Sequence, residues 1–392
     1  MTIDQIIHTE AVRRKEFPVV AERIFLAHAG VAPLPRVAAD AMREFCDHGV
    51  VNAQENPWSW GKVLSARASA AALISCTPEE IALLGPTSLG VSLVANGIPW
   101  DAGDQVLYYR DDYPANVYPW TNLVERGVEP VSLTPRHHGV ITWDLIEAAL
   151  TPRTRLVALA SCNFLTGYRI DVDTIGKNLR SRGILFSLDA IQTLGAFPVS
   201  VEHVDFLSAD SHKWLLGPAA AGIFYVKRSR FEELRPSLLG SWNVVSPQFV
   251  AQDNIQFEDT ARRYEPGMLN LPGIIGMGAS MDLLRKLNIS DIAKRLILLH
   301  DALLEILKKI GFRPYTDEDQ LCDLPDAVWK SGIVTVTHPK ADIKELARTL
   351  DSKGVVVSYR QDRAGTPVIR FSPHFYNTEE EFERVAAILA NV

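Results

Sequence analysis

The chain has 392 residues, which is enough for one large α/β domain and a smaller second domain. Its 47 acidic and 40 basic side chains give a formal net charge of −7 at pH 7 without any basic run, so nucleic acid is not expected as a partner. No stretch approaches the ~18 apolar residues of a membrane span and the first residues lack a signal pattern, so we expect a cytoplasmic protein without a membrane partner. Four separated cysteines form no CxxC pair, which predicts reduced thiols and no metal site.

A helix start is indicated at residues 85–90, which read Gly-Pro-Thr-Ser-Leu-Gly. Hydroxyls and free backbone amides at the first turn of a helix form a binding site for an anion such as phosphate. An ordinary helix cap by Thr87 or Ser88 is the alternative interpretation.

Short apolar runs typical of β-strands alternate with helical patterns along most of the chain. The clearest runs span residues 105–109, 156–160, 184–188, 206–207 and 221–226. This alternation predicts an α/β fold with a mostly parallel central sheet sandwiched by helices. Several polar residues follow these runs directly, at the edge where ligands collect in open α/β sheets.

The last third of the sequence predicts a smaller α+β C-terminal domain. A long amphipathic helix is expected from Gly273 onward, leading into this domain. Two strands, at 332–336 and 354–358, flank a helix over residues 342–352.

The final helix should begin after Thr378, because Glu381 follows it at the spacing of a capping box. Together these elements predict three parts of the chain. Residues 1–20 form an N-terminal segment that packs on the small domain, residues 21–272 the large domain, and residues 273–392 the small C-terminal domain.

Lys213 is the most informative candidate for a catalytic residue. It closes the segment 204–213 and precedes the apolar run 221–226, so we expect it in a turn between two buried strands. Burial would lower its pKa and make the amine nucleophilic, as Schiff-base chemistry with a carbonyl cofactor requires. The sequence therefore points to pyridoxal phosphate (PLP) as the cofactor. The alternative is a strand-end lysine whose amine reaches water.

Asp189 supports the same interpretation, since it ends the apolar run 184–188. A PLP enzyme needs a buried carboxylate to keep the pyridine nitrogen protonated, so that the ring can act as an electron sink. Gln192, three residues on, can donate to the phenolic oxygen of PLP. A helix N-cap is the alternative role for Asp189, but its occurrence together with Lys213 favours the cofactor.

Eight segments in the same order resemble the class V aminotransferase, or cysteine desulfurase-like, family of fold-type I PLP enzymes. They span residues 25–35, 86–90, 115–120, 163–167, 189–192, 211–214, 264–270 and 369–378. The resemblance implies that Lys213 carries PLP and then removes the α-proton of an amino-acid substrate bound as an external aldimine. It also implies a homodimer in which the partner subunit completes each site.

The resemblance assigns the phosphate to the helix start described above, with Thr87, Ser88 and Leu89 as its contacts. Ser211 and His212, which precede Lys213, would be further phosphate or pocket contacts.

Two positions depart from the family pattern. Tyr113 stands where many relatives have a histidine stacked on the pyridine ring; the stacking survives this change, and the phenol becomes a candidate acid or base. Met268 stands where relatives usually carry a threonine that reaches the phosphate of the partner subunit. A backbone amide of the Gly267–Met268 loop could still contribute to that site.

Arg370 is the candidate for binding the α-carboxylate of the substrate. In the family, the arginine at this position holds the carboxylate through two parallel hydrogen bonds, with Asn163 and the loop of Ala29 and Gly30 closing the same pocket. A salt bridge with a nearby acid is the alternative for Arg370. Arg360 is a candidate for binding a second anionic group on the substrate.

The segment between Arg360 and Arg370 contains no cysteine. Cysteine desulfurases of the related group place a nucleophilic cysteine in this loop, where it takes up the sulfur as a persulfide. The reactions left open are β-elimination, as in cysteine or cystine C–S lyases, transamination and epimerisation; similarity to the lyase and epimerase members favours the lyase. A PLP-binding protein without catalysis would be expected to lack Lys213 or Arg370, and both are present.

Overall fold

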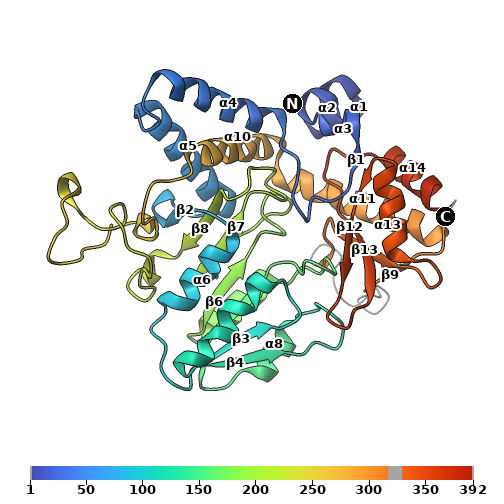
Figure 1. The fold of residues 1–392 in the computed structure, drawn as a ribbon. Helices are drawn as coiled ribbons and strands as arrows, with labels where there is room; N and C mark the ends of the chain where they lie inside the picture. The colour runs from blue at the N-terminus through green and yellow to red at the C-terminus, as the bar shows by residue number, and fades with distance from the viewer. Residues whose placement is uncertain (1, 317–328, 391–392) are drawn as a thin grey trace.

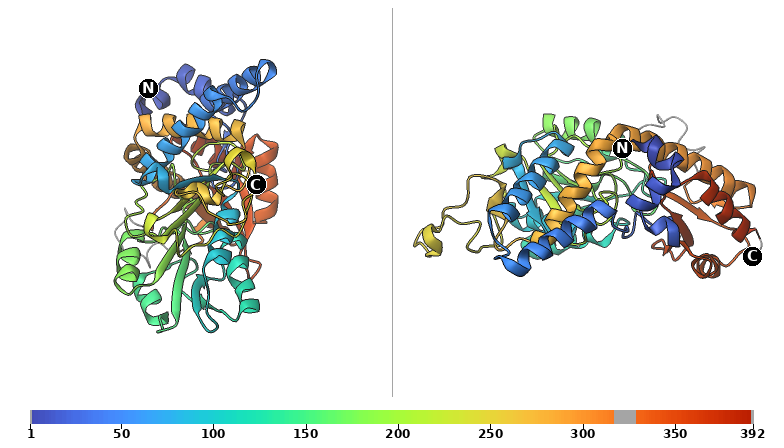
Figure 2. Two further views of the ribbon diagram at one scale, coloured as in Figure 1. Left: turned by 90° about the vertical axis from the view of Figure 1, so that its left-hand side faces the viewer. Right: turned by 90° about the horizontal axis from the view of Figure 1, so that it is seen from above.

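The computed structural model describes residues 2–316 and 329–390. These residues form a seven-stranded sheet covered by helices on both faces and a four-stranded sheet at the opposite end of the molecule (Figure 1). The N-terminal helices and the C-terminal helix lie close to one another beside the smaller sheet (Figures 1 and 2).

The large sheet has the strand order β2-β8-β7-β6-β5-β3-β4. Neighbouring strands are parallel from β4 through β7, whereas β8 runs antiparallel to both β7 and β2. The predicted mostly parallel sheet is therefore confirmed. The strands are β2 (Ile81–Leu84), β3 (Gln105–Tyr109), β4 (Glu129–Leu133), β5 (Thr154–Ala160), β6 (Leu185–Asp189), β7 (Phe206–Asp210) and β8 (Gly222–Val226).

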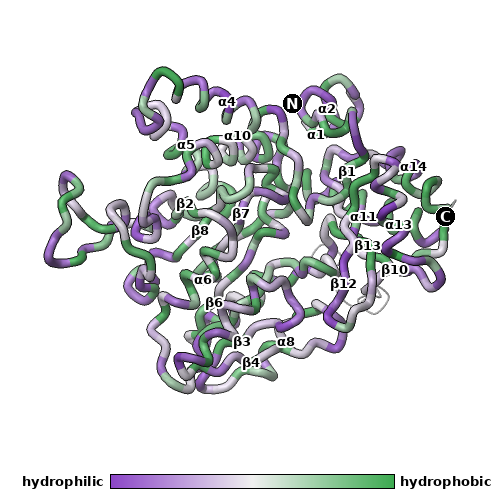
Figure 3. The backbone as a smooth tube through the Cα atoms, viewed as in Figure 1, coloured by the Kyte–Doolittle hydropathy of each residue, from purple (hydrophilic) through white to green (hydrophobic). Residues whose placement is uncertain are grey.

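Every residue of the central strands β6, β7 and β8 is buried because both faces of the sheet are covered, and most of these residues are apolar (Figure 3). Alternate side chains of each strand enter two separate cores. One core lies under α6 (Thr87–Gly97) and α7 (Tyr118–Thr121). The other lies under the remaining helices of this part of the chain, which are α4 (Arg36–Val51), α5 (Pro57–Ile74), α8 (Trp143–Ala149), α9 (Val172–Ser181) and α10 (Leu271–Leu287).

Helix α10 differs from the amphipathic helix expected from Gly273. It begins at Leu271, and 12 of its 17 residues are buried, because it packs between α4 and α5. Two of its glycines permit this approach: a Cβ on Gly276 would lie 2.8 Å from Met42, and a Cβ on Gly278 would lie 3.0 Å from Ala66. The prediction of an amphipathic helix was wrong, and we propose that the boundary between the two domains lies after α10, at Asn288.

The smaller sheet has the order β12-β13-β10-β9 and is antiparallel throughout. The helix expected at residues 342–352 is confirmed as α13, and the capping box of Thr378 and Glu381 is confirmed at the start of α14. The elements are β9 (Arg313–Pro314), β10 (Val334–Thr337), β12 (Ser358–Gln361), β13 (Pro367–Phe371), α11 (Ile289–Lys309), α13 (Ile343–Ser352) and α14 (Glu379–Leu389).

The single strand expected at residues 354–358 is divided in two. Its first part, β11 (Val355–Val356), pairs in parallel with β1 (Ile24–Phe25) near the N-terminus, and only β12 joins the smaller sheet. The prediction of one strand was wrong because its first half pairs with β1, which lies more than 300 residues away in the sequence.

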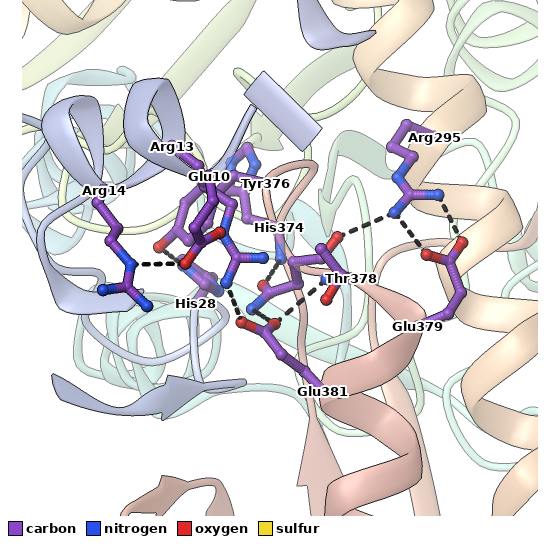
Figure 4. Close-up of polar contacts among 11 residues, drawn as sticks. Glu10, Arg13, Arg14, His28, Arg295, His374, Tyr376, Thr378, Glu379 and Glu381 are labelled. Carbon is purple, nitrogen blue, oxygen red and sulfur yellow. Dashed lines mark hydrogen bonds and ion pairs between the residues drawn. The ribbon is translucent and has the colours of Figure 1, made fainter. Parts of the chain in front are cut away.

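The N-terminal segment consists of α1 (Ile3–His8), α2 (Glu10–Glu16) and α3 (Val19–Glu22). Its buried Arg13 forms an ion pair with Glu381 of α14 at 2.6 Å (Figure 4). Phe17 stacks on Tyr376 with ring centroids 4.1 Å apart. These contacts attach the start of the chain to its C-terminal region. Within the described ranges, no helix combines the length and apolar character needed to cross a membrane.

Replacing Gly176 of α9 with alanine should destabilise the protein by about 1–3 kcal/mol, because the new methyl group would lie 2.6 Å from the carbonyl oxygen of His203. Gly61 of α5 is the matched control, since a Cβ there meets no atom within 4 Å. Gly61→Ala should stabilise the protein by about 0.5–1 kcal/mol through its helix propensity. Urea unfolding measures both changes, and equal shifts for the two variants would contradict the packing of α9.

Candidate active site

One pocket lies where the carboxyl ends of β6 and β7 face strands β12 and β13 of the smaller sheet. This is the edge at which ligands bind in open α/β sheets. The structure brings ten of the candidate residues together there. They are Ala29, Gly30, Thr87, Ser88, Tyr113, Asp189, His212, Lys213, Arg360 and Arg370.

Lys213 lies in the connection between the antiparallel strands β7 and β8, as its sequence context predicts. The residue is only 7% exposed, so its amine does not extend into solvent. Burial lowers the pKa of Lys213 to about 8; Asp189 opposes this shift and Arg370 adds to it. A substantial fraction of the amine is therefore neutral and nucleophilic near neutral pH.

Asp189 is buried at the end of β6, and both of its carboxylate oxygens are held. Oδ1 accepts a hydrogen bond from the amide of Ile191, and Oδ2 accepts one from Nδ2 of Asn116, each at 2.9 Å. Burial raises the pKa of Asp189, while these bonds and the charge of Lys213 favour the ionised form. Turns follow Asp189 rather than a helix, so it is not a helix N-cap.

The contact of Asn116 with Asp189 was not predicted from the sequence. Asn116 lies in the short 3₁₀ turn Pro114–Asn116, within the segment 115–120 that carries the family resemblance. That segment was the available signal, but only the tertiary structure brings its amide to Asp189.

Thr87 and Ser88 form the first turn of α6 and line the pocket. The hydroxyl of Thr87 accepts a hydrogen bond from the amide of Asp210 at 2.9 Å. The carboxylate of Asp210 also lies 3.1 Å from Nδ1 of His212, although this nitrogen forms no hydrogen bond. The free end of a helix beside a histidine is suited to bind a phosphate group.

Tyr113 is half exposed and covers the entrance to this pocket. Its ring centroid lies 5.4 Å from Nζ of Lys213, and its edge contacts Phe164. An aromatic face above the amine is placed to stack on a flat cofactor.

Arg370 is 1% exposed and forms no ion pair among the described residues, so the alternative of a salt bridge is not found. Nη1 donates to the carbonyl oxygen of Phe164 at 2.6 Å, Nη2 donates to Ser358, and Nε has no partner. Burial and the nearby charge of Arg360 lower the pKa of Arg370 to about 9. A buried cation without a counter-ion is suited to bind an anionic ligand.

Arg360 shares the pocket-facing side of the small sheet with Arg370. In the register of β12 and β13, Ser358 lies opposite Arg370, so both point to the same face, and Arg360 follows Ser358 by two residues on that face. Arg360 donates to the carbonyl oxygen of its own neighbour, Tyr359. The strand register therefore places Arg360 and Arg370 as diagonal neighbours on the same face of β12 and β13.

The other six candidate residues do not line the pocket of their own subunit. Gln192 is buried behind it, donating to the carbonyl oxygen of Ala29 and accepting from the indole of Trp214. Asn163 accepts three bonds on Oδ1, while its buried Nδ2 has no partner. The others are Leu89, Ser211, Gly267 and Met268.

Local bonds account for two of these placements. The amide of Leu89 donates to Pro86 and its side chain packs against the second core, while the hydroxyl of Ser211 donates to Pro218. Met268 is more than half exposed on a loop away from the pocket. A role for the Gly267–Met268 loop in a neighbouring subunit stays a prediction.

The residues present fit PLP. The pocket combines a buried amine, a buried carboxylate held by Asn116, a helix start and an aromatic ring, which match the aldehyde, the ring nitrogen, the phosphate and the flat face of this cofactor. No other acidic side chain among the described residues lines the pocket, so Asp189 alone can serve the ring nitrogen there.

The amine of Lys213 should titrate near pH 8 in cofactor-free protein, instead of near 10.5, because burial disfavours its charged form. Reductive methylation with formaldehyde, an uncharged reagent, measures the neutral fraction when the Lys213 peptide is quantified by mass spectrometry. Its rate should rise about tenfold per pH unit below pH 8 and level off above it. A rate that still rises tenfold between pH 9 and 10 would contradict the lowered pKa.

Comparisons with known proteins agree with this geometry. The pattern of the family "Aminotransferase class-V" matches residues 24–385. A probable cysteine desulfurase of Methanothermobacter thermautotrophicus is 28% identical over 406 residues, covering 98% of both chains.

Solved structures share the fold. The apo cysteine desulfurase from Thermococcus onnurineus NA1 has a TM-score of 0.87 at 23% identity, covering 98% of this chain and 97% of that one. The cystine C–S lyase C-DES, in complex with its product cysteine persulfide, has a TM-score of 0.85 at 19% identity, covering 96% and 99%. The family pattern spans nearly the whole chain, and this protein belongs to the PLP-dependent class-V aminotransferase family.

Proposed function

We propose that this protein is a PLP-dependent C–S lyase that eliminates sulfur from the β-carbon of a cysteine- or cystine-type amino acid. The observation that carries the proposal is one pocket in which the neutralisable amine of Lys213 lies with a buried Arg370 that has no carboxylate partner. A base and an α-carboxylate site in the same pocket as Asp189 are what removal of an α-proton requires. The names of the cystine C–S lyase C-DES and of the desulfurase relatives support the sulfur-containing substrate.

The cofactor would be held by residues from several elements of the large sheet and its connections. Bound PLP supplies an electron sink that stabilises the negative charge left at Cα when its proton is removed. Asp189, held by Asn116, would keep a proton on the ring nitrogen, and Tyr113 would cover the ring. One N–H of Gln192 donates to Ala29, so only its second N–H would be free to donate to the phenolic oxygen. The start of α6 and His212 bind the phosphate.

A second copy of the chain completes the phosphate site in this proposal. The exposed position of Met268 supports it, because a loop that lies away from its own pocket is free to reach that of a partner. The protein is therefore proposed to act as a homodimer. The exposed free thiol of Cys46 supports a reducing compartment, the cytoplasm.

The substrate is bound through its charged groups. Arg370 holds the α-carboxylate, with Ala29 and Gly30 closing the pocket beside it. Asn163 does not line the pocket, so its buried and unpartnered Nδ2 would have to turn toward the same group once substrate is bound. Arg360 binds a second anionic group, such as the distal carboxylate of cystine.

Lys213 then moves one proton. Its Nζ takes the proton from Cα, the electron pair forms a double bond between Cα and Cβ, and the Cβ–S bond breaks with sulfur leaving as a thiolate or persulfide anion. Addition of water to the three-carbon product releases pyruvate and ammonia. The sum of these steps is an elimination followed by hydrolysis and needs no oxidant or reductant.

The route of the sulfur separates this proposal from cysteine desulfuration through an enzyme persulfide. The turn between β12 and β13 spans only residues 362–366 and contains no cysteine. Cys162 is buried, and burial raises the pKa of its thiol to about 12, so it is a poor nucleophile. Cys46 lies on α4, and Cys322 lies outside the described residues. Cys76 follows α5, and burial raises the pKa of its thiol to about 12. The sulfur is therefore proposed to leave on a diffusible product.

The purified protein loaded with PLP should release pyruvate from cystine in a one-to-one ratio with persulfide, because elimination produces both. Lactate dehydrogenase measures the pyruvate, and cyanolysis measures the persulfide. Lys213→Ala should abolish both products, since no other lysine among the described residues lines the pocket. Turnover that depends on an added α-keto acid, or racemisation without pyruvate, would instead identify a transaminase or an epimerase.

Arg370→Gln should raise KM for both cystine and cysteine by about 10- to 100-fold, because each substrate has an α-carboxylate that loses a charged hydrogen-bond donor. Arg360→Gln is the matched variant on the same wall. It should raise KM for cystine by a similar factor and leave KM for cysteine within about threefold, since cysteine lacks a distal anion. Equal effects of Arg360→Gln on the two substrates would contradict its assignment.

A further inference from the structure

His374 lies directly behind the turn that carries Lys213. It belongs to the segment that links β13 to α14 and is fully buried. Its Nδ1 accepts a hydrogen bond from the amide of Phe375 at 2.9 Å, so the ring proton is on Nε2. Nε2 donates at 3.1 Å to the carbonyl oxygen of Trp214, the residue after Lys213. Burial lowers the pKa of His374 to about 4, which keeps the imidazole neutral and this tautomer in place.

The carbonyl of Trp214 depends on this bond. Trp214 is fully buried, and among the described residues His374 alone donates to its carbonyl oxygen. Gly195 approaches the same oxygen so closely that a Cβ there would lie 2.6 Å from it, so the backbone packs tightly around this carbonyl. A buried carbonyl without a donor would favour rearrangement of the turn.

The turn after Lys213 also contains backbone strain that must be held by its surroundings. Leu216 has a φ of 55°, in the left-handed region that branched and bulky residues avoid. The amide of Leu216 donates to the carbonyl oxygen of Lys213 at 3.0 Å, so the strained residue and the lysine belong to the same turn. Contacts from outside the turn therefore decide where the amine lies.

A chain of buried polar contacts fixes His374 in turn (Figure 4). The amide of His374 donates to Oδ1 of Asn377 at 2.8 Å, and Nδ2 of Asn377 donates to Glu381 at 2.7 Å. Glu381 pairs with Arg13 of α2 at 2.6 Å. These contacts connect the N-terminal segment, the start of α14 and the Lys213 turn.

We propose that His374 is a positioning residue for Lys213, and that the chain Arg13–Glu381–Asn377 holds His374 in place. His374 does not touch the pocket; it acts through the backbone of Trp214. The inference rests on the assignment of Lys213 as the PLP-binding amine but not on the identity of the substrate. The N-terminal segment thereby becomes part of what orders the active site.

Two substitutions of His374 distinguish the contributions of its two hydrogen bonds, to Trp214 and from Phe375. In His374→Gln the longer side chain places an N–H near the position of Nε2 and can still donate to Trp214. In His374→Asn the amide oxygen lies near the position of Nδ1 and can still accept from Phe375, but no donor reaches Trp214. A role in positioning Lys213 therefore predicts different behaviour of the two variants.

The measurement is the rate at which cofactor-free, full-length protein acquires borohydride-reducible PLP on Lys213, quantified on its peptide by mass spectrometry. His374→Asn should slow this rate by about tenfold or more, and His374→Gln should stay within about threefold of the unchanged protein. For turnover, His374→Asn should lower kcat while KM changes little, since both arginines are untouched. Equal rates for the two variants would overturn the proposal, and this readout does not depend on C–S cleavage.

Glu381→Gln tests the contact between Arg13 and Asn377, which is the part of this network farthest from Lys213. It also provides a second test if His374→Asn does not fold. The amide it introduces cannot accept both from Asn377 and from Arg13 as the carboxylate does. Glu379→Gln is the matched control, because Glu379 also begins α14 and also pairs with an arginine, Arg295, at 2.6 Å, but on the surface. PLP incorporation on Lys213 should slow about threefold or more in Glu381→Gln and remain unchanged in Glu379→Gln. An equal rate in the two variants would show that the contacts of Arg13, Glu381 and Asn377 do not affect the position of Lys213.

Discussion

The site depends on removal of the Lys213 amine from water. Burial lowers its pKa to about 8, and the pocket adds two arginines but only one carboxylate, Asp189, among the described residues that line it. A pocket with this balance lacks negative charge. The phosphate of a cofactor and the carboxylates of a substrate supply the missing charge, so binding and the pKa of the amine are coupled through the same electrostatic field.

Both sheets contribute residues to the site. The large sheet provides Asp189 and Lys213 at the carboxyl ends of its strands, whereas the small sheet provides both arginines on one face of β12 and β13. The relative position of the sheets therefore sets the distance between the amine of Lys213 and the guanidinium of Arg370. Parallel pairing of β1 with β11 and the ion pair of Arg13 with Glu381 attach the N-terminal segment to the small sheet, close to this junction.

Members of the family with a common fold differ in where the sulfur goes. In this chain the turn between β12 and β13 is short, and Arg363 within it contacts Asp111 of the loop that leads to Tyr113. Such a turn has neither a thiol nor the length to carry one to the substrate. The same scaffold can thus support elimination without taking up the sulfur, because the steps at Cα require only the cofactor, a base and an anion-binding wall.

The sequence alone determined the α/β class and the central strands and identified Lys213 and Asp189 as candidate site residues, because strand periodicity and the residues that follow each strand are local features. The capping box at Thr378 was likewise visible, since its two partners are three residues apart. Other features depended on contacts between distant segments. The division of the strand at 354–358, the burial of α10, the bond from Asn116 to Asp189 and the position of His374 behind Lys213 all join residues that the sequence separates by 70 or more positions or by whole helices. Local propensity has no access to such pairs, so only the tertiary structure decided them.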